Sequence, residues 1–148
     1  MDNAREVFGS SRLPGENERF ATYLLESLID EDKSGRLFKA IDENLRRPAC
    51  VRIFSRELSG NSSFADVLRI QMQAAASLND PGIVPLYEIG ESDGHCFMAT
   101  ELSPGGFLSQ EVITNGKFAL SEALDLIIKC AETLQSASEL RIFHGHLR

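Results

Sequence analysis

The 148-residue chain lacks a long apolar run, a paired-cysteine motif and an excess of basic residues, and each absence excludes a class of protein. Its apolar runs are only a few residues long, whereas a transmembrane helix needs about 20, so no membrane segment is expected. The start at Met1 has no basic stretch leading into an apolar core, so no signal peptide is expected. The three cysteines are widely spaced and form no Cys-x-x-Cys pair, which favours buried, reduced thiols in a cytoplasmic protein.

The charge balance is acidic, with a net charge of -7. Proteins that bind nucleic acids or anionic membranes need clustered positive charge, so neither kind of partner is expected. The hydrophobic fraction of 43% and the charged fraction of 25% are ordinary for a globular chain. The length suits one compact domain or one lobe of a larger domain.

The first half of the chain changes pattern twice. Residues 1–19 are polar, with glycine, serine and proline close together, and we expect a flexible leader. Residues 20–54 contain three strand-like segments, with the acidic turn Asp30–Gly35 between the first two. A helical period then begins near Ser63, which we expect to cap the helix, and residues 79–82 end it.

The second half begins with a predicted hairpin. Residues 83–90 and 95–102 form its strands, and the Asp-Gly pair in the Glu91–Gly94 turn supplies the positive backbone angles that such a turn needs. Residues 121–139 then predict a strong helix with acidic residues near its positive end. The expected order is three strands, a helix, two strands and a helix.

Several stretches in this order resemble protein kinases, in particular the bacterial branch of the eukaryotic-like Ser/Thr kinases. They are Tyr23–Glu26, Gly35–Asp42, Ala74–Glu91 and the last five residues, His144–Arg148. The resemblance covers about residues 20–148 and implies an α+β fold. Residues 20–102 would form a kinase-like small lobe, a five-stranded antiparallel sheet plus one helix. Residues 103–148 would form the segment after the hinge, the first large-lobe helices and a remnant of the catalytic loop.

The kinase phosphate loop, Gly-x-Gly-x-x-Gly, matches Asp30, Asp32 and Gly35, so only its last glycine is present. Carboxylates at the other two positions would repel a polyphosphate, by on the order of 3 kcal/mol per like-charge pair at ~6 Å and an effective dielectric of ~20. Lys33 could in principle anchor a phosphate instead, but a solvated lysine at the turn is favoured. A solvated acidic turn without nucleotide explains the segment equally well.

Other positions of the expected nucleotide cleft are partly retained. Arg52 stands in place of the strand lysine and Gln71 in place of its helix glutamate, so the implied ion pair becomes at most a hydrogen bond. Arg52 as an ordinary strand residue is an equally good alternative. Glu101 and Ser103 lie in the implied hinge, where backbone groups would bind adenine. The candidate nucleotide residues are Gly35, Lys33, Arg52, Gln71, Glu101 and Ser103.

The catalytic loop departs furthest from the kinase pattern. His144 matches the motif histidine, Gly145 the arginine, His146 the catalytic aspartate and Arg148 the lysine. The chain ends before the asparagine and the Asp-Phe-Gly segment that hold magnesium in kinases. We therefore expect no intact catalytic residue, no metal site, and ATP at most without productive magnesium. Two ordinary loop histidines are favoured over metal ligands.

These departures predict a catalytically inactive, pseudokinase-type module that is not an enzyme as it stands and that binds or regulates a protein partner. This expectation depends on whether the natural chain continues past Arg148. One alternative is a part of a longer Ser/Thr kinase-like protein with residual ATP binding or weak phosphotransfer through Lys33. Another is a structural module without nucleotide that dimerises through the helix 121–139, where Leu126 and Ile128 widen the apolar surface.

Overall fold

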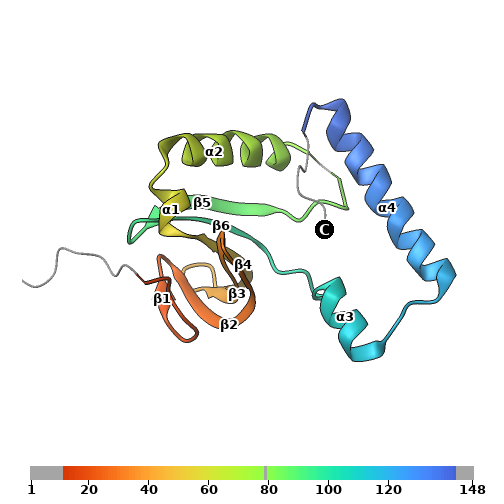
Figure 1. Cartoon of the computed structure of the whole chain (residues 1–148), viewed down its shortest axis with the longest axis horizontal. Coiled ribbons are helices and arrows are strands. Elements are labelled where there is room, and N and C mark those ends of the chain that lie inside the picture. The colour runs from red at the N-terminus through yellow and green to blue at the C-terminus, as the bar shows by residue number, and fades with distance from the viewer. Residues whose placement is uncertain (1–11, 79, 143–148) are drawn as a thin grey trace, which may run out of the picture. The chain divides into compact units, whose positions relative to one another are not determined.

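The computed structural model describes residues 12–78 and 80–142, and the chain divides into two compact units (Figure 1). The first unit consists of residues 1–69 and 86–102, and the second of residues 70–85 and 103–148. The predicted lobe, residues 20–102, stays a prediction, because residues 70–85 within it belong to the second unit. Helix α2 begins in the first unit and ends in the second. No helix of the described ranges is long and apolar enough to cross a membrane.

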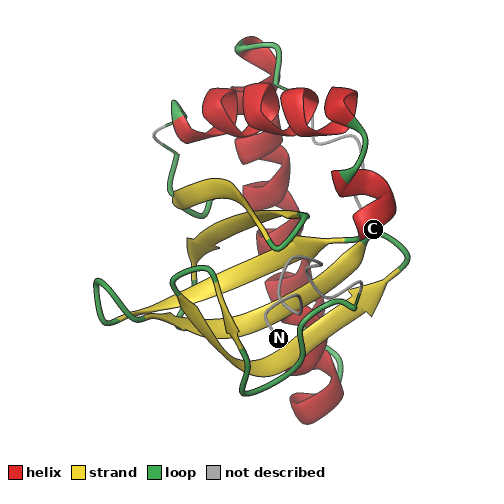
Figure 2. Cartoon of the chain, turned by 90° about the vertical axis from the view of Figure 1, so that its left-hand side faces the viewer, coloured by secondary structure: helices red, strands yellow, loops and turns green. Residues whose placement is uncertain are grey.

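The first unit is built on an antiparallel sheet, whose strands are yellow in Figure 2. Its six strands have the order β1-β2-β3-β4-β6-β5. This result confirms the predicted α+β small lobe, and all five predicted strands are present. The two-residue β1 is an additional edge strand. The strands are β1 (Arg19–Phe20), β2 (Tyr23–Asp32), β3 (Gly35–Asp42), β4 (Arg47–Phe54), β5 (Leu86–Ser92) and β6 (His95–Glu101).

One face of the sheet forms the hydrophobic core, because alternate residues of each strand point to the same side. The ring of Phe97 lies near the middle of this core and makes edge-to-face contacts with Phe20 and Tyr23, at centroid distances of 5.4 and 6.0 Å. On β4, Val51 and Ile53 are fully buried in this core. Arg52, which lies between them and is a candidate nucleotide-binding residue, therefore belongs to the opposite face of the sheet.

The predicted leader is only partly described, because residues 1–11 lie outside the described ranges. Residues 12–18 run beside β2 and bond to it: the Asn17 amide donates to the Leu25 carbonyl at 2.7 Å, and the Leu28 amide donates to the Glu16 carboxylate at 2.7 Å. Arg19 already belongs to β1. Regular structure therefore begins one residue before the predicted lobe boundary at Phe20.

Two helices follow β4. The short α1 (Arg56–Ser59) is capped by the side chain of Ser55. The longer α2 (Ser62–Ala76) is capped by Asn61, whose side-chain carbonyl accepts from the Ser63 amide at 3.0 Å. The predicted cap at Ser63 is therefore wrong by two residues.

The hairpin of β5 and β6 has the predicted turn. Asp93 and Gly94 have φ angles of 50° and 76°. Positive angles at both central residues are typical of a tight two-residue hairpin turn. The Asp-Gly prediction is confirmed, although β5 begins at Leu86 rather than at residue 83.

The second unit contains α3 (Leu108–Asn115) and α4 (Leu120–Glu139). Helix α4 begins one residue before the predicted start, and the Glu122 carboxylate accepts from the Ala119 amide at 3.0 Å. The Thr133 hydroxyl donates to the Asp80 carboxylate at 3.2 Å and so joins α4 to the loop after α2. The apolar stripe of α4 is exposed, at 49–78% of each residue, in Leu120, Leu124, Ile127 and Ile128.

Candidate functional site

Arg52 is the centre of the candidate site, and the alternation of β4 decides where it points. Its neighbours Val51 and Ile53 face the core, so Arg52 lies on the other face together with Cys50. In register it lies between Leu37 of β3 and Met98 of β6. Its side chain is only 12% exposed, so a charge in this place needs partners within the protein.

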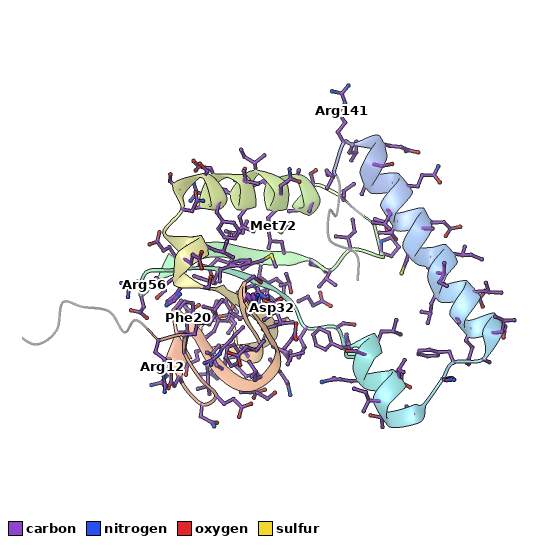
Figure 3. All side chains as sticks on the ribbon, viewed as in Figure 1. Arg12, Phe20, Asp32, Arg56, Met72 and Arg141 are labelled. Carbon is purple, nitrogen blue, oxygen red and sulfur yellow. The ribbon has the colours of Figure 1, made fainter. Side chains whose placement is uncertain are left out.

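The acidic turn between β2 and β3 supplies those partners. Nη2 of Arg52 donates to Oδ1 of Asp32 at 2.6 Å and to the hydroxyl of Ser34. Nη1 lies 3.8 Å from Oδ2 of Asp30. The two aspartates are the residues that stand at the first two glycine positions of the predicted phosphate loop. Asp32 lies at this turn in Figure 3, where it is labelled. The Asp32 carboxylate is thus hydrogen-bonded to Arg52, whereas the Asp30 side chain lies near Arg52 and remains 53% exposed.

Gly35 allows the turn to approach β4 this closely. Its φ of +142° is a conformation that other residues rarely adopt, and a Cβ atom there would lie 2.0 Å from the Ile53 carbonyl oxygen and 2.9 Å from Cα of Phe54. The Ser55 amide donates to the Ser34 carbonyl at 2.8 Å, directly beside this contact. The packing against β4 requires glycine here, whether or not a phosphate binds.

The turn also has internal order. Oδ1 of Asp32 accepts from both the amide and the hydroxyl of Ser34, at 2.8 and 2.6 Å. This bond of an aspartate to the backbone two residues on is a common turn device. Ser34 was not among the predicted site residues, although its position two residues after Asp32 was a signal for this arrangement. Lys33 is exposed at the tip of the turn.

Cys50 and Thr100 lie beside Arg52 on the same face of the sheet. They are direct cross-strand partners on β4 and β6. Burial raises the pKa of the Cys50 thiol to about 11, against opposing effects of the hydrogen bond with Thr100 and of the Arg52 charge. The thiol is therefore neutral at physiological pH. The side chains of Cys50 and Thr100 next to Arg52 carry no charge, whereas Lys39, the partner of Cys50 on β3, pairs with Glu26.

The other predicted site residues are divided between the two units. Lys33, Gly35, Arg52 and Glu101 belong to the first unit, and Glu101 is the half-buried last residue of β6. Gln71 and Ser103 belong to the second unit. The predicted bond between Arg52 and Gln71 therefore stays a prediction.

The predicted catalytic-loop positions, His144, Gly145, His146 and Arg148, lie outside the described residues. The structure says nothing about their geometry, so their roles also stay predictions.

The chain is similar in sequence to bacterial kinases, although no family model matches it. It is 28% identical over 131 residues to the serine/threonine-protein kinase PknA of Mycobacterium tuberculosis, a match that covers 85% of this chain and 30% of PknA. It is 27% identical over 129 residues to the probable serine/threonine-protein kinase pknA2 of Bifidobacterium longum, of which it covers 17%. The chain thus spans less than a third of the length of these relatives.

The fold is similar to solved kinase domains. The kinase domain of PknI from M. tuberculosis superposes with a TM-score of 0.74 and 18% identity, over 91% of this chain and 55% of that domain. A double mutant of the same domain gives a TM-score of 0.76 over 56% of that domain. At this identity the likeness shows the fold alone. The chain corresponds to about half of a kinase domain.

One expectation from the sequence is wrong. We expected a chain that is not an enzyme, but the relatives in sequence are named serine/threonine-protein kinases, which are enzymes. The matches also do not show catalytic inactivity, because they cover only part of each relative. The chain is therefore a relative of the bacterial serine/threonine protein kinases, and it carries a fragment of the protein-kinase fold that is like the small lobe with the early helices after it.

Proposed function

We propose that this chain is the small-lobe part of a Ser/Thr protein-kinase-like protein and acts in it as a regulatory or binding module with weak affinity for the phosphates of ATP. Its sequence relatives and its fold support the kinase-like part of this proposal. One observation supports the weak affinity for phosphates: Arg52, at the position of the strand lysine, is already bound to Asp32. A phosphate has to compete with that carboxylate.

The size of this competition can be set from ordinary hydrogen-bond strengths. A hydrogen bond between charged groups contributes about 1.5–3 kcal/mol net, and 1.4 kcal/mol corresponds to about tenfold in an equilibrium constant. Loss of the Arg52–Asp32 bond on phosphate binding would therefore weaken the affinity for ATP by roughly 10- to 100-fold. The uncharged side chains of Cys50 and Thr100 impose no such penalty on the nucleoside part of the ligand.

A thermal melt tests this proposal directly. The purified chain is melted with adenosine, ADP or ATP, each with and without magnesium. A ligand at about 100 times its dissociation constant adds about 2.7 kcal/mol to the native state. We expect the three ligands to raise the melting temperature equally and slightly. A much larger rise with magnesium and ATP than with adenosine would contradict the proposal.

A second candidate function is association through α4. The exposed stripe Leu120, Leu124, Ile127 and Ile128 supports a contact with a protein partner or with a second copy of the chain. Sedimentation velocity over a wide concentration range tests the second copy, with Leu124→Glu as the disrupting variant. A mass that rises with concentration in the native chain, but not in the variant, is the expected result for self-association.

We also propose a cytoplasmic setting for this module. The described chain has three free thiols, of which two, Cys50 and Cys96, are buried and one, Cys130, is exposed. An exposed free thiol is stable in a reducing compartment. Fractionation of the source cells, with immunodetection of the native protein, checks this location.

A further inference from the structure

We propose that Asp32 sets the ligand preference of this lobe: its carboxylate occupies Arg52 in place of a phosphate, and a polyphosphate binds Arg52 only after Asp32 has released it. The inference rests on the proposed function and names the residue responsible for the weak phosphate affinity. The nearby Asp30 contributes less, because its closest oxygen lies 3.8 Å from the guanidinium.

The contacts of the guanidinium show why a phosphate cannot simply be added. Nη2 already has two acceptors, Oδ1 of Asp32 at 2.6 Å and the Ser34 hydroxyl, and Nη1 faces Asp30. The side chain of Arg52 is 12% exposed and that of Asp32 is 25% exposed. A guanidinium has its N–H donors in a fixed planar geometry, so a bidentate phosphate needs the edge that the carboxylates now face.

The turn holds the carboxylate in this position. Asp32 is fixed by the amide and hydroxyl of Ser34, and the carbonyl of Ser34 is fixed in turn by the Ser55 amide at the end of β4. Gly35 lies against the backbone of β4 at the same place. The release of Arg52 therefore disturbs an anchored turn rather than a free side chain, which makes the carboxylate a strong competitor.

The same turn offers a matched control. Glu31 is adjacent to Asp32 and carries the same charge, but its carboxylate pairs with Arg36, at 2.8 Å. Arg36 also donates to the carbonyls of Leu13 and Pro14, away from Arg52. Each of the variants Glu31→Gln and Asp32→Asn thus removes one negative charge from the same turn. Only Asp32→Asn removes the charge that pairs with Arg52. In Asp32→Asn the side-chain carbonyl oxygen can still accept from Ser34, so the turn is retained. The same oxygen can accept from Arg52 only as a neutral partner, so the variant loses the charge and the stronger charge-assisted bond.

The experiment measures the affinity of the full chain for inorganic tripolyphosphate by titration calorimetry, in parallel with adenosine. We expect Asp32→Asn to bind tripolyphosphate at least about tenfold more tightly than the native chain, the effect of one charged hydrogen bond. Glu31→Gln should stay within about threefold of the native chain, since the Glu31 carboxylate is half exposed and already paired with Arg36, and such surface pairs contribute little. The adenosine affinity should be the same in all three proteins. The double variant Asp32→Asn with Arg52→Ala should lose the gain.

A second measurement needs no ligand and no nucleotide site. In NMR spectra of the guanidinium groups, the Nη protons of Arg52 should exchange slowly in the native chain and in Glu31→Gln, and faster in Asp32→Asn, where a weaker neutral acceptor replaces the carboxylate. Equal exchange in all three refutes the inference, even if a variant fails to bind tripolyphosphate. Equal tripolyphosphate affinity of Asp32→Asn and Glu31→Gln, including no binding by either, also refutes it. A native chain that prefers magnesium and ATP to adenosine contradicts the proposed function instead, which keeps the two failures distinguishable.

Discussion

Gly35→Ala should destabilise the sheet more than any other single methyl addition at a turn of this lobe. A Cβ atom at Gly35 would lie 2.0 Å from the Ile53 carbonyl oxygen and 2.9 Å from Cα of Phe54. Both neighbours are backbone atoms of β4, a central strand of the sheet, so neither can rotate away as a flexible side chain would. The strand itself has to move.

Two effects contribute to the expected loss in the free energy of unfolding. A non-glycine residue in a sparsely populated backbone region costs about 1–3 kcal/mol, and φ at Gly35 is +142°. Forcing an extra methyl group into a packed site costs another ~1–3 kcal/mol. The sum is about 2–6 kcal/mol, a large part of the roughly 5–15 kcal/mol that stabilises an ordinary domain. At ~4–8 °C per kcal/mol for a unit of this size, the melting temperature should fall by at least ~8 °C.

Far-UV circular dichroism in urea and on heating measures this loss, because the chain has no tryptophan to serve as a fluorescent probe. Gly94→Ala is the matched control. Gly94 also has a positive φ, +76°, but the nearest atom to its Cβ would be Nη2 of Arg56, at 3.8 Å. The control should show the cost of the left-handed backbone conformation alone, about 1–2 kcal/mol. Equal losses for the two variants would refute the steric argument.

Three further predictions concern the buried polar groups of the first unit. At pH ~8 a thiol reagent should label the exposed Cys130 rapidly and Cys50 slowly, because burial raises the Cys50 pKa to about 11. Mass spectrometry of the labelled peptides measures the two rates, and equal rates would contradict this prediction. The Cys50 pKa is raised from 9.0 in the unfolded chain, so its stabilising effect is complete below pH 9.0 and is lost as pH rises toward about 11. The free energy of unfolding should fall more over that range in the native chain than in Cys50→Ala. Tyr23→Phe should cost about 1–2 kcal/mol, because the Tyr23 hydroxyl donates to the Glu88 carboxylate at 3.0 Å; Glu88→Gln, which keeps an acceptor, should cost less in the same urea titration.

The sequence predicted the sheet well, because its strand segments are rich in strand-forming residues and are bounded by turn residues. The Asp-Gly turn, for example, has backbone needs that few other residues meet. The helix cap was harder to predict. Asn61, Ser62 and Ser63 are all good cap residues in a row, and only the structure shows which side chain accepts the bond. The two-residue β1 is too short to show any period.

The contacts of Arg52 could not be predicted from the sequence, because they depend on register rather than on local pattern. Asp32 and Arg52 are 20 residues apart, and the antiparallel pairing of β3 with β4 brings them together by placing Gly35 opposite Phe54. The sequence offered a phosphate loop or a solvated acidic turn as interpretations of Asp30–Gly35. Neither includes an acidic turn bound to a basic residue of the sheet.

The physical constraints on the three glycine positions explain why two of them can carry carboxylates. Neither Asp30 nor Asp32 has a positive φ in the described structure, so the fold of the turn does not require glycine at either position. Gly35 alone has both a positive φ and a blocked Cβ direction. Side chains of either charge can therefore occupy the first two positions without a change in the backbone. Here the aspartates at these positions are the charged partners of Arg52. It follows that glycine restored at positions 30 and 32 should alter what Arg52 binds far more than how the sheet folds.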